Sequence, residues 1–271
     1  MSPDASWTLE PGAIALTLVL GGAYLHRWIE VRRKNGPRGA SAWRLTSFAL
    51  GLLLILVALV SPVDRLAEQI LAMHMVQHVI LLDFAPILLI LGLTKTILRP
   101  ITRRMAPVEH AAGLLGHPVV AVVFYIAAMW VWHVPALYDA AAQHASIHVV
   151  EHVCFASAGV LYWWHLIGPV RSRLRTGGMQ PIAYMLSSKL FLGILGIVLT
   201  FSPEAIYAFY TDQPDYWGLT PGEDQAVAGL IMALEQSIIM GVVLAWLFAR
   251  MLAESEREEQ RAERYASPDP S

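Results

Sequence analysis

Apolar residues recur along the chain in runs of about 20 residues, and the charged residues fall between these runs. At a rise of about 1.5 Å per residue, such a run forms a helix that crosses roughly 30 Å of hydrocarbon. We therefore expect an all-α, polytopic transmembrane bundle that occupies residues 1–252 as one domain. The pattern predicts seven spans, at residues 12–31, 45–62, 72–98, 118–137, 144–167, 182–209 and 226–252.

The positively charged residues lie on one side of the predicted bundle. The segments after the first, third and fifth spans are basic, whereas the loops on the other side contribute only Arg65. Because Lys and Arg are retained on the cytoplasmic side, we expect the N-terminus outside and the C-terminus in the cytoplasm. The basic residues are Arg32, Arg33, Lys34, Arg38, Arg44, Arg99, Arg103, Arg104, Arg171, Arg173 and Arg175.

The end of the chain differs from the rest. Nearly half of residues 253–271 are charged, which predicts a cytoplasmic tail that extends the last helix and then frays into a partly disordered end.

Composition further limits the class of protein to which the chain can belong. The chain is 56% hydrophobic and 15% charged, against about 25% charged residues in soluble proteins. A single cysteine, Cys154, excludes an intramolecular disulfide and a metal site made of cysteines alone. The sequence has no nucleophile–base triad, phosphate-binding loop or HExxH pattern, so we expect neither an enzyme nor a nucleic-acid-binding protein.

Histidines cluster toward the predicted outer side of the membrane. His74 and His78 open the third span, His133 closes the fourth, and the fifth begins with a row of three. Residues four apart share a helix face, and Glu151 lies beside the row in the fifth span. The sequence therefore predicts a metal site built from several helices. The three histidines of that row are His144, His148 and His152.

The seventh span adds two candidate ligands, Met232 and Glu235, which are three residues apart and share a face. Imidazole with thioether favours copper, particularly Cu(I), while imidazole alone also suits zinc, iron or nickel. An interfacial belt of polar side chains at the outer membrane surface is the alternative that binds no metal.

Two ionisable residues fall near the middle of the membrane. Asp83 lies in the third span and Lys189 in the sixth, at matching depths. Since an unpaired charge in hydrocarbon is costly, we expect the two to form an ion pair, with a structural role or a proton-relay role. Pro86 follows Asp83 and should kink its helix, and Pro135 should end or bend the fourth span.

Four short motifs resemble one family. They are HMVQH at residues 74–78, WHVP at 132–135 with Tyr138 shortly after, HVVEH at 148–152 and DQAVAGLIM at 224–232. Because the four motifs occur in this order, the chain resembles the CtaG family of caa(3)-type cytochrome c oxidase assembly factors, which are seven-span bacterial membrane proteins. The family's polar positions correspond here to His74, His78, His133, His148, Glu151, His152, Asp224, Gln225 and Met232.

The resemblance implies a bacterial inner (plasma) membrane protein that helps to build the haem–copper oxidase by delivering or inserting copper. Its partners would be cytochrome c oxidase subunits and a periplasmic or extracellular copper donor. Whether the chain forms a homo-oligomer is left open by the sequence. An aromatic residue often follows the family's methionine, where this chain has Ala233. His144 extends the histidine row but does not correspond to a family position.

Three other functions remain open. A copper transporter would need ligands along the whole membrane thickness, whereas the candidates lie toward one side. A membrane cytochrome could bind haem b between two histidines of different helices. A scaffold for oxidase subunits would use no metal at all.

Overall fold

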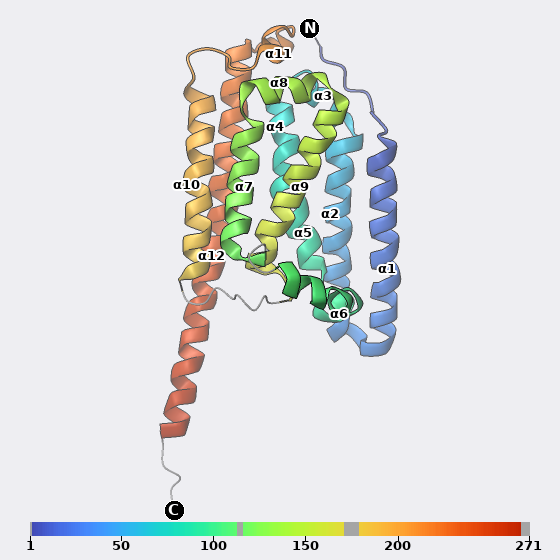
Figure 1. The fold of residues 1–271 in the computed structure, drawn as a ribbon, viewed down its shortest axis with the longest axis vertical. Coiled ribbons are helices and arrows are strands. Elements are labelled where there is room, and N and C mark those ends of the chain that lie inside the picture. The colour runs from blue at the N-terminus through green and yellow to red at the C-terminus, as the bar shows by residue number, and fades with distance from the viewer. Residues whose placement is uncertain (1, 113–115, 171–178, 267–271) are drawn as a thin grey trace, which may run out of the picture.

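The computed structural model describes residues 2–112, 116–170 and 179–266, and every regular element in these ranges is a helix. Long helices run side by side along one axis, as Figure 1 shows, which confirms the predicted all-α bundle. Large apolar side chains such as Leu18, Val153 and Ile238 are exposed on its flanks, as expected of helices that face lipid. The long elements are α1 (Pro11–Gly39), α2 (Ala42–Val60), α4 (Leu71–Val79) with η1 (Ile80–Phe84) and α5 (Ala85–Gly92), α7 (Pro118–Trp132), α9 (Ala145–Ile167), α10 (Gln180–Phe201) and α12 (Pro221–Ala266).

Six of these helical segments are long and apolar enough to cross a membrane, and a bent pair brings the number of spans up to seven. That pair is α7 and α8 (Pro135–Gln143), whose axes differ in direction by 75°. Val134 precedes Pro135 and has an extended backbone, because the proline ring disfavours a helical conformation in the residue before it. The predicted fourth span, 118–137, therefore ends early, at Trp132.

Several other helix ends differ from the predicted span limits. The third span ends at Gly92 instead of residue 98, and α6 (Lys95–Ala112) starts anew where the Thr94 hydroxyl accepts a hydrogen bond from the Ile97 amide (3.1 Å). The sixth span ends at Phe201 instead of residue 209. The last helix continues beyond residue 252 through Ala266, and the tail residues 267–271 lie outside the described ranges.

The third span contains a π-helical turn just before the proline that was expected to kink it. Pro86 has no N–H to donate to the Leu82 carbonyl, and one step earlier the Ala85 amide bonds to Ile80, a five-residue step. The Leu82 carbonyl instead faces Gly159 of α9, where a Cβ atom would lie only 2.0 Å from its oxygen. A glycine is thus required for α9 to approach η1 this closely.

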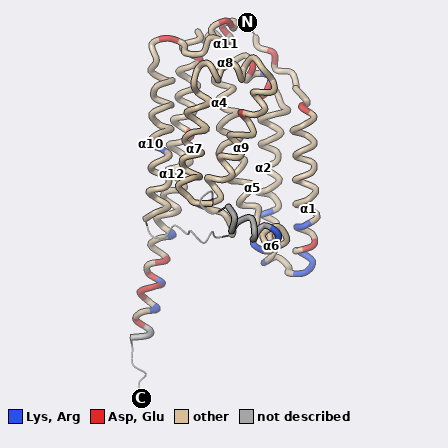
Figure 2. Tube along the Cα trace, viewed as in Figure 1, with Lys and Arg blue, Asp and Glu red and all other residues tan. Residues whose placement is uncertain are grey.

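Short elements cap the bundle at the end that carries the N-terminus, which we call the upper face; the opposite end, crossed by α6, is the lower face (Figure 1). Lys and Arg gather at the lower face (Figure 2), so the basic pattern used for the orientation is preserved. The orientation itself stays a prediction, and Arg171, Arg173 and Arg175 lie outside the described residues. The capping elements are α3 (Pro62–Ala67), α8, α11 (Ala208–Thr211) and η3 (Tyr216–Gly218).

Candidate metal centre

Five histidines and one glutamate converge beneath the upper face. Two histidines come from α4, one from the residue after α7, and the remaining side chains from α9. Neighbouring rings lie close, with centroids 4.2 Å apart for His74 and His78, and 4.1 Å apart for His148 and His152. We call this set the histidine cluster; its members are His74, His78, His133, His148, Glu151 and His152.

The cluster contains two triads that share one carboxylate. In one, ligand atoms of His74, His148 and Glu151 all lie within 4.8 Å of one another; in the other, those of His78, His152 and Glu151 do. The Nε2 atoms of His74 and His78 are 3.8 and 3.6 Å from Oε2 and Oε1 of Glu151. Ligands of a tetrahedral ion at about 2.1 Å lie about 3.4 Å apart, so small movements would suffice to coordinate a metal.

In two imidazoles of the cluster, hydrogen bonds determine which ring nitrogen carries the proton and which keeps its lone pair. His133 Nδ1 lies 2.7 Å from the Met129 carbonyl, which can only accept, so Nδ1 carries the proton. The Tyr210 hydroxyl donates its one proton to the Ala67 carbonyl (2.7 Å), and His74 Nδ1 must therefore donate to it (3.1 Å). In both rings Nε2 keeps its lone pair, as a metal-ligating histidine requires.

The free donor atoms of the cluster are buried without hydrogen-bond partners among the described residues. Glu151 and His78 are fully buried, His74 is 2% exposed and His152 8% exposed. Such atoms are costly unless something pairs with them, and a cation would pair with all of them at once. They are the Nε2 atoms of His74, His78, His133, His148 and His152 and both carboxylate oxygens of Glu151.

A cavity of about 500 Å³ connects the cluster to the upper face. His74 and the half-buried His148 line it together with Tyr210. Asp4 and Glu68 also line the cavity, and both approach the guanidinium of Arg65, at 3.6 and 2.7 Å. A small cation could thus reach the cluster from the upper face without any opening of the bundle.

Residues 22–254 match the family model described as cytochrome c oxidase caa3 assembly factor. The chain belongs to this family. An uncharacterized protein of Mycobacterium leprae is 24% identical over 277 residues, covering 96% of the chain and 41% of that protein. Uncharacterized proteins of Mycobacterium bovis and Mycobacterium tuberculosis are 25% identical over 276 residues, covering 95% of the chain and 41% of each. The chain thus spans about two fifths of the length of these curated relatives. No solved structure matches it.

Two of the predicted ligands of this Caa3_CtaG family member lie away from the cluster. His144 is exposed at the N-terminus of α9, one turn beyond the buried rings, because the helix begins only at Ala145. Glu235 bonds to Gln236 deeper in the bundle, since α12 has already carried it below the level of the histidines. Neither residue belongs to a triad among the described residues.

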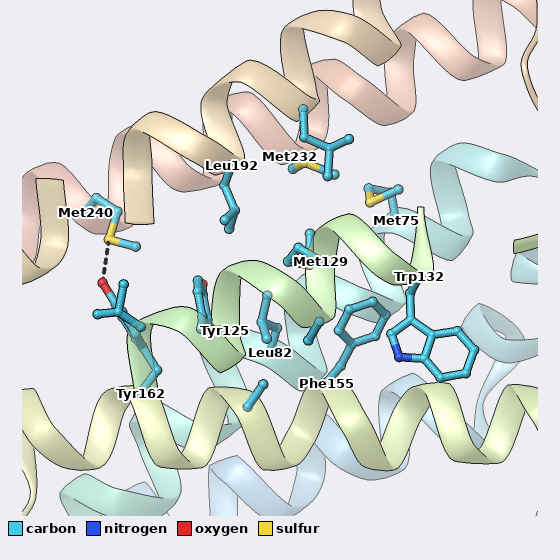
Figure 3. Close-up of a cluster of buried hydrophobic side chains, with 14 of the residues drawn as sticks. Met75, Leu82, Tyr125, Met129, Trp132, Phe155, Tyr162, Leu192, Met232 and Met240 are labelled. Atoms are coloured by element: carbon cyan, nitrogen blue, oxygen red, sulfur yellow. Dashed lines mark hydrogen bonds between the residues drawn. The ribbon is translucent and has the colours of Figure 1, made fainter. Parts of the chain in front are cut away.

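Met232 is buried with Met75 and Met129 in the hydrophobic core, from α12, α4 and α7 (Figure 3). Apolar packing accounts for its position, and its role as a ligand stays a prediction.

The predicted ion pair between Asp83 and Lys189 does not form. One Asp83 oxygen accepts hydrogen bonds from the Tyr125 hydroxyl and the Trp163 indole, both at 2.7 Å, and the other from the Gln236 amide at 3.2 Å. Lys189 Nζ has no hydrogen-bond or ion-pair partner among the described residues. Donors from three other helices thus satisfy Asp83, so it needs no lysine.

Several residues that support the centre in this family member were not among the predicted ligands, although Asp224 corresponds to one of the family's polar positions. Tyr210 orients His74, and Tyr207 donates to the His133 carbonyl at 3.3 Å. Asp224 accepts from the Leu71 and Ala72 amides, at 2.7 and 3.0 Å, and so caps the N-terminus of α4 from another helix. Gln77 bonds to the Ala58 carbonyl and to Asp64 of α3, at 2.8 and 2.7 Å. The contacts of Asp224 and Gln77 fix α4, the helix that carries His74 and His78.

Proposed function

We propose that the chain binds copper in the histidine cluster as cargo and hands it to cytochrome c oxidase during assembly of that enzyme. The observation that carries this proposal is the convergence of five imidazole nitrogens and one carboxylate, all buried and without partners among the described residues. Gathering these groups is costly unless a cation binds them. Membership of the caa3 assembly factor family supports oxidase assembly as the purpose.

Copper fits the donor set and the family. Imidazole nitrogen and carboxylate oxygen bind Cu(II) well, and histidine pairs also suit Cu(I). Zinc accepts the same ligands, so the donors alone do not distinguish the two metals. Because the family's oxidase is a haem–copper enzyme, copper is the cargo that such an assembly factor would carry.

Delivery requires that the ion can leave as well as enter. His148 is half-buried and lines the cavity with His74, so one side of the cluster is open to the upper face. We therefore propose that a copper donor and the oxidase subunits meet the chain at the upper face. With the basic lower face in the cytoplasm of a bacterial inner membrane, this surface would face outward.

The competing functions find less support in the geometry. A transporter needs ligands through the full thickness. Met129, Leu82 and Phe155 belong to the described apolar core (Figure 3), and the buried Asp83 carboxylate is taken up by hydrogen bonds from Tyr125, Trp163 and Gln236. Haem b needs a planar slot between two imidazoles. The rings of His74 and His148, from different helices, are stacked with centroids 5.3 Å apart, and His78 packs on Phe155 with centroids 4.4 Å apart, so neither pair leaves such a slot.

Complementation tests the proposal. Cells that lack the chain would receive the wild type, a variant with His74, His78, His148 and His152 all replaced by Ala, or His144→Ala as a matched control. We expect the fourfold variant to yield oxidase with haem but little copper, measured as copper per haem in the purified enzyme. His144→Ala should restore full copper, because His144 lies outside the cluster. Normal copper in the oxidase of cells carrying a stably expressed fourfold variant would refute copper delivery.

A further inference from the structure

Glu151 lies between two sets of imidazoles and presents one carboxylate oxygen to each. Its Oε2 atom faces His74 at 3.8 Å, while its Oε1 atom faces His78 at 3.6 Å. A carboxylate in this position can bridge two ions, as the glutamates of dimetal centres in helical bundles do. We propose that the histidine cluster binds two copper ions, bridged by Glu151; this inference rests on the proposed copper-binding function.

The number of donors also exceeds what one ion can use. Five Nε2 atoms and two carboxylate oxygens are buried and without hydrogen-bond partners among the described residues. Cu(I) takes up to about four ligands in a site of this kind, and tetragonal Cu(II) about four strongly bound ones. A single ion would therefore leave several buried donors unsatisfied, at a cost that a second ion removes.

The two triads define two sites with different surroundings. The cavity site consists of His74, His148 and Glu151 Oε2, and both histidines line the cavity that opens at the upper face. The inner site consists of His78, His152 and Glu151 Oε1. His133, whose ring centroid is 6.2 Å from that of His78, can supply a fourth ligand to the inner site.

These surroundings predict an order of binding. The inner site has more donors and is more enclosed, so the first ion binds there. As Cu(I), this ion neutralises the Glu151 carboxylate, and a second ion then adds a net positive charge to a buried cluster. The cavity site therefore binds its ion more weakly and exchanges it more readily. It is the ion in the cavity site that would be passed to a partner.

Metal stoichiometry tests the inference on the full chain purified in detergent. Cu(I) would be titrated under reducing, oxygen-free conditions against bicinchoninate, which competes for it, and bound copper would be counted by elemental analysis. The wild type should bind two ions in two separate steps. His148→Ala should retain one ion, the tighter, and His152→Ala should weaken the tighter step at least tenfold. His144→Ala, one turn away on the same chain, should bind two like the wild type. X-ray absorption of the doubly loaded protein should show copper–copper scattering at about 3.5–4 Å.

The outcomes separate the two proposals. Binding of no copper by well-folded wild type would refute the proposed function itself. One ion per chain would leave that function standing and overturn the bridged pair. Two ions that both persist in His148→Ala and His152→Ala would also overturn it, because the ions would then lie outside the cluster. If one variant does not fold, as judged by gel filtration, the other variant and the copper–copper distance still decide whether the cluster binds a bridged pair of ions.

Discussion

Two imidazoles of the histidine cluster are oriented by groups that accept a hydrogen bond from their Nδ1 atoms. The Met129 carbonyl plays this part for His133, and the Tyr210 hydroxyl, already committed to the Ala67 carbonyl, plays it for His74. Partners of this kind fix the tautomer and the ring direction of a ligand, and they raise its basicity. The affinity of the cluster should thus depend on residues that never touch the metal.

Tyr210→Phe tests this dependence. Loss of the hydroxyl frees His74 to rotate or to change tautomer, so we expect copper affinity to fall by about 10- to 100-fold. The fold should survive, because the ring still packs beneath the upper face. Competition titration against a copper chelator measures the effect.

Tyr207→Phe is the matched control for that substitution. It removes a hydroxyl that donates to the backbone carbonyl of His133 and touches no imidazole nitrogen. Equal losses of affinity in the two variants would mean that Tyr210 acts on packing and not on His74.

Single residues also show where sequence reasoning works. Spacing by four residues predicted that His74 and His78, and His148 and His152, share helix faces, and the structure brings both pairs into one cluster. Spacing does not give the depth of a neighbouring helix, so Glu235 was assigned to the wrong polar group. Asp83 found its partners in tyrosine, tryptophan and glutamine side chains, whose polar atoms the charge pattern does not reveal.

At the scale of helices, the position of η1 against α9 brings the two halves of the cluster together. The Leu82 carbonyl, to which Pro86 has no N–H to donate, meets Gly159 at a separation that admits no side chain. The proline was visible in the sequence and a kink was predicted. The π-helical turn was not, because it depends on this contact between segments that are distant along the chain.

Gly159→Ala should therefore push α9 away from η1. A Cβ atom at 2.0 Å from the Leu82 oxygen cannot be accommodated without movement of the backbone. We expect a loss of about 1–3 kcal/mol in stability, and weaker copper binding because Glu151 and His152 move with α9. Thermal unfolding in detergent and copper titration measure the two effects.

Gly193→Ala in α10 provides the comparison, since a Cβ atom there has no neighbour within 4 Å. It should leave stability unchanged or raise it slightly. If the two glycine variants behave alike, the close approach of α9 and η1 does not limit stability.

At the scale of the whole molecule, the basic residues and the histidine cluster lie at opposite ends of the bundle. Basic residues gather at the lower face, whereas the cavity and the histidine cluster lie at the upper face. The hydrophobic pattern predicted the bundle and most helix positions correctly, because span length follows from membrane thickness. It could not predict that α6 crosses the lower face, because a polar contact at Thr94 starts that helix. The bend of 75° between α7 and α8 was predicted from Pro135, and not from the hydrophobic pattern.

Reporter fusions test the orientation that delivery from the outer side requires. Alkaline phosphatase, which is active only outside the cytoplasm, should be active when fused in the loop between α10 and α12. A fluorescent protein that folds only in the cytoplasm should fluoresce when fused after residue 266. The reverse pattern would place the cavity on the cytoplasmic side and rule out receipt of copper from an outer donor.

Anomalous diffraction at the copper absorption edge, from crystals of the full chain loaded with one equivalent of copper, tests the central claim most directly. We expect the strongest anomalous peak within coordination distance of Glu151 and at least two of the imidazoles of His78, His152 and His133. A peak elsewhere in the molecule, with the cluster side chains bonded only to water or to each other, would contradict the account.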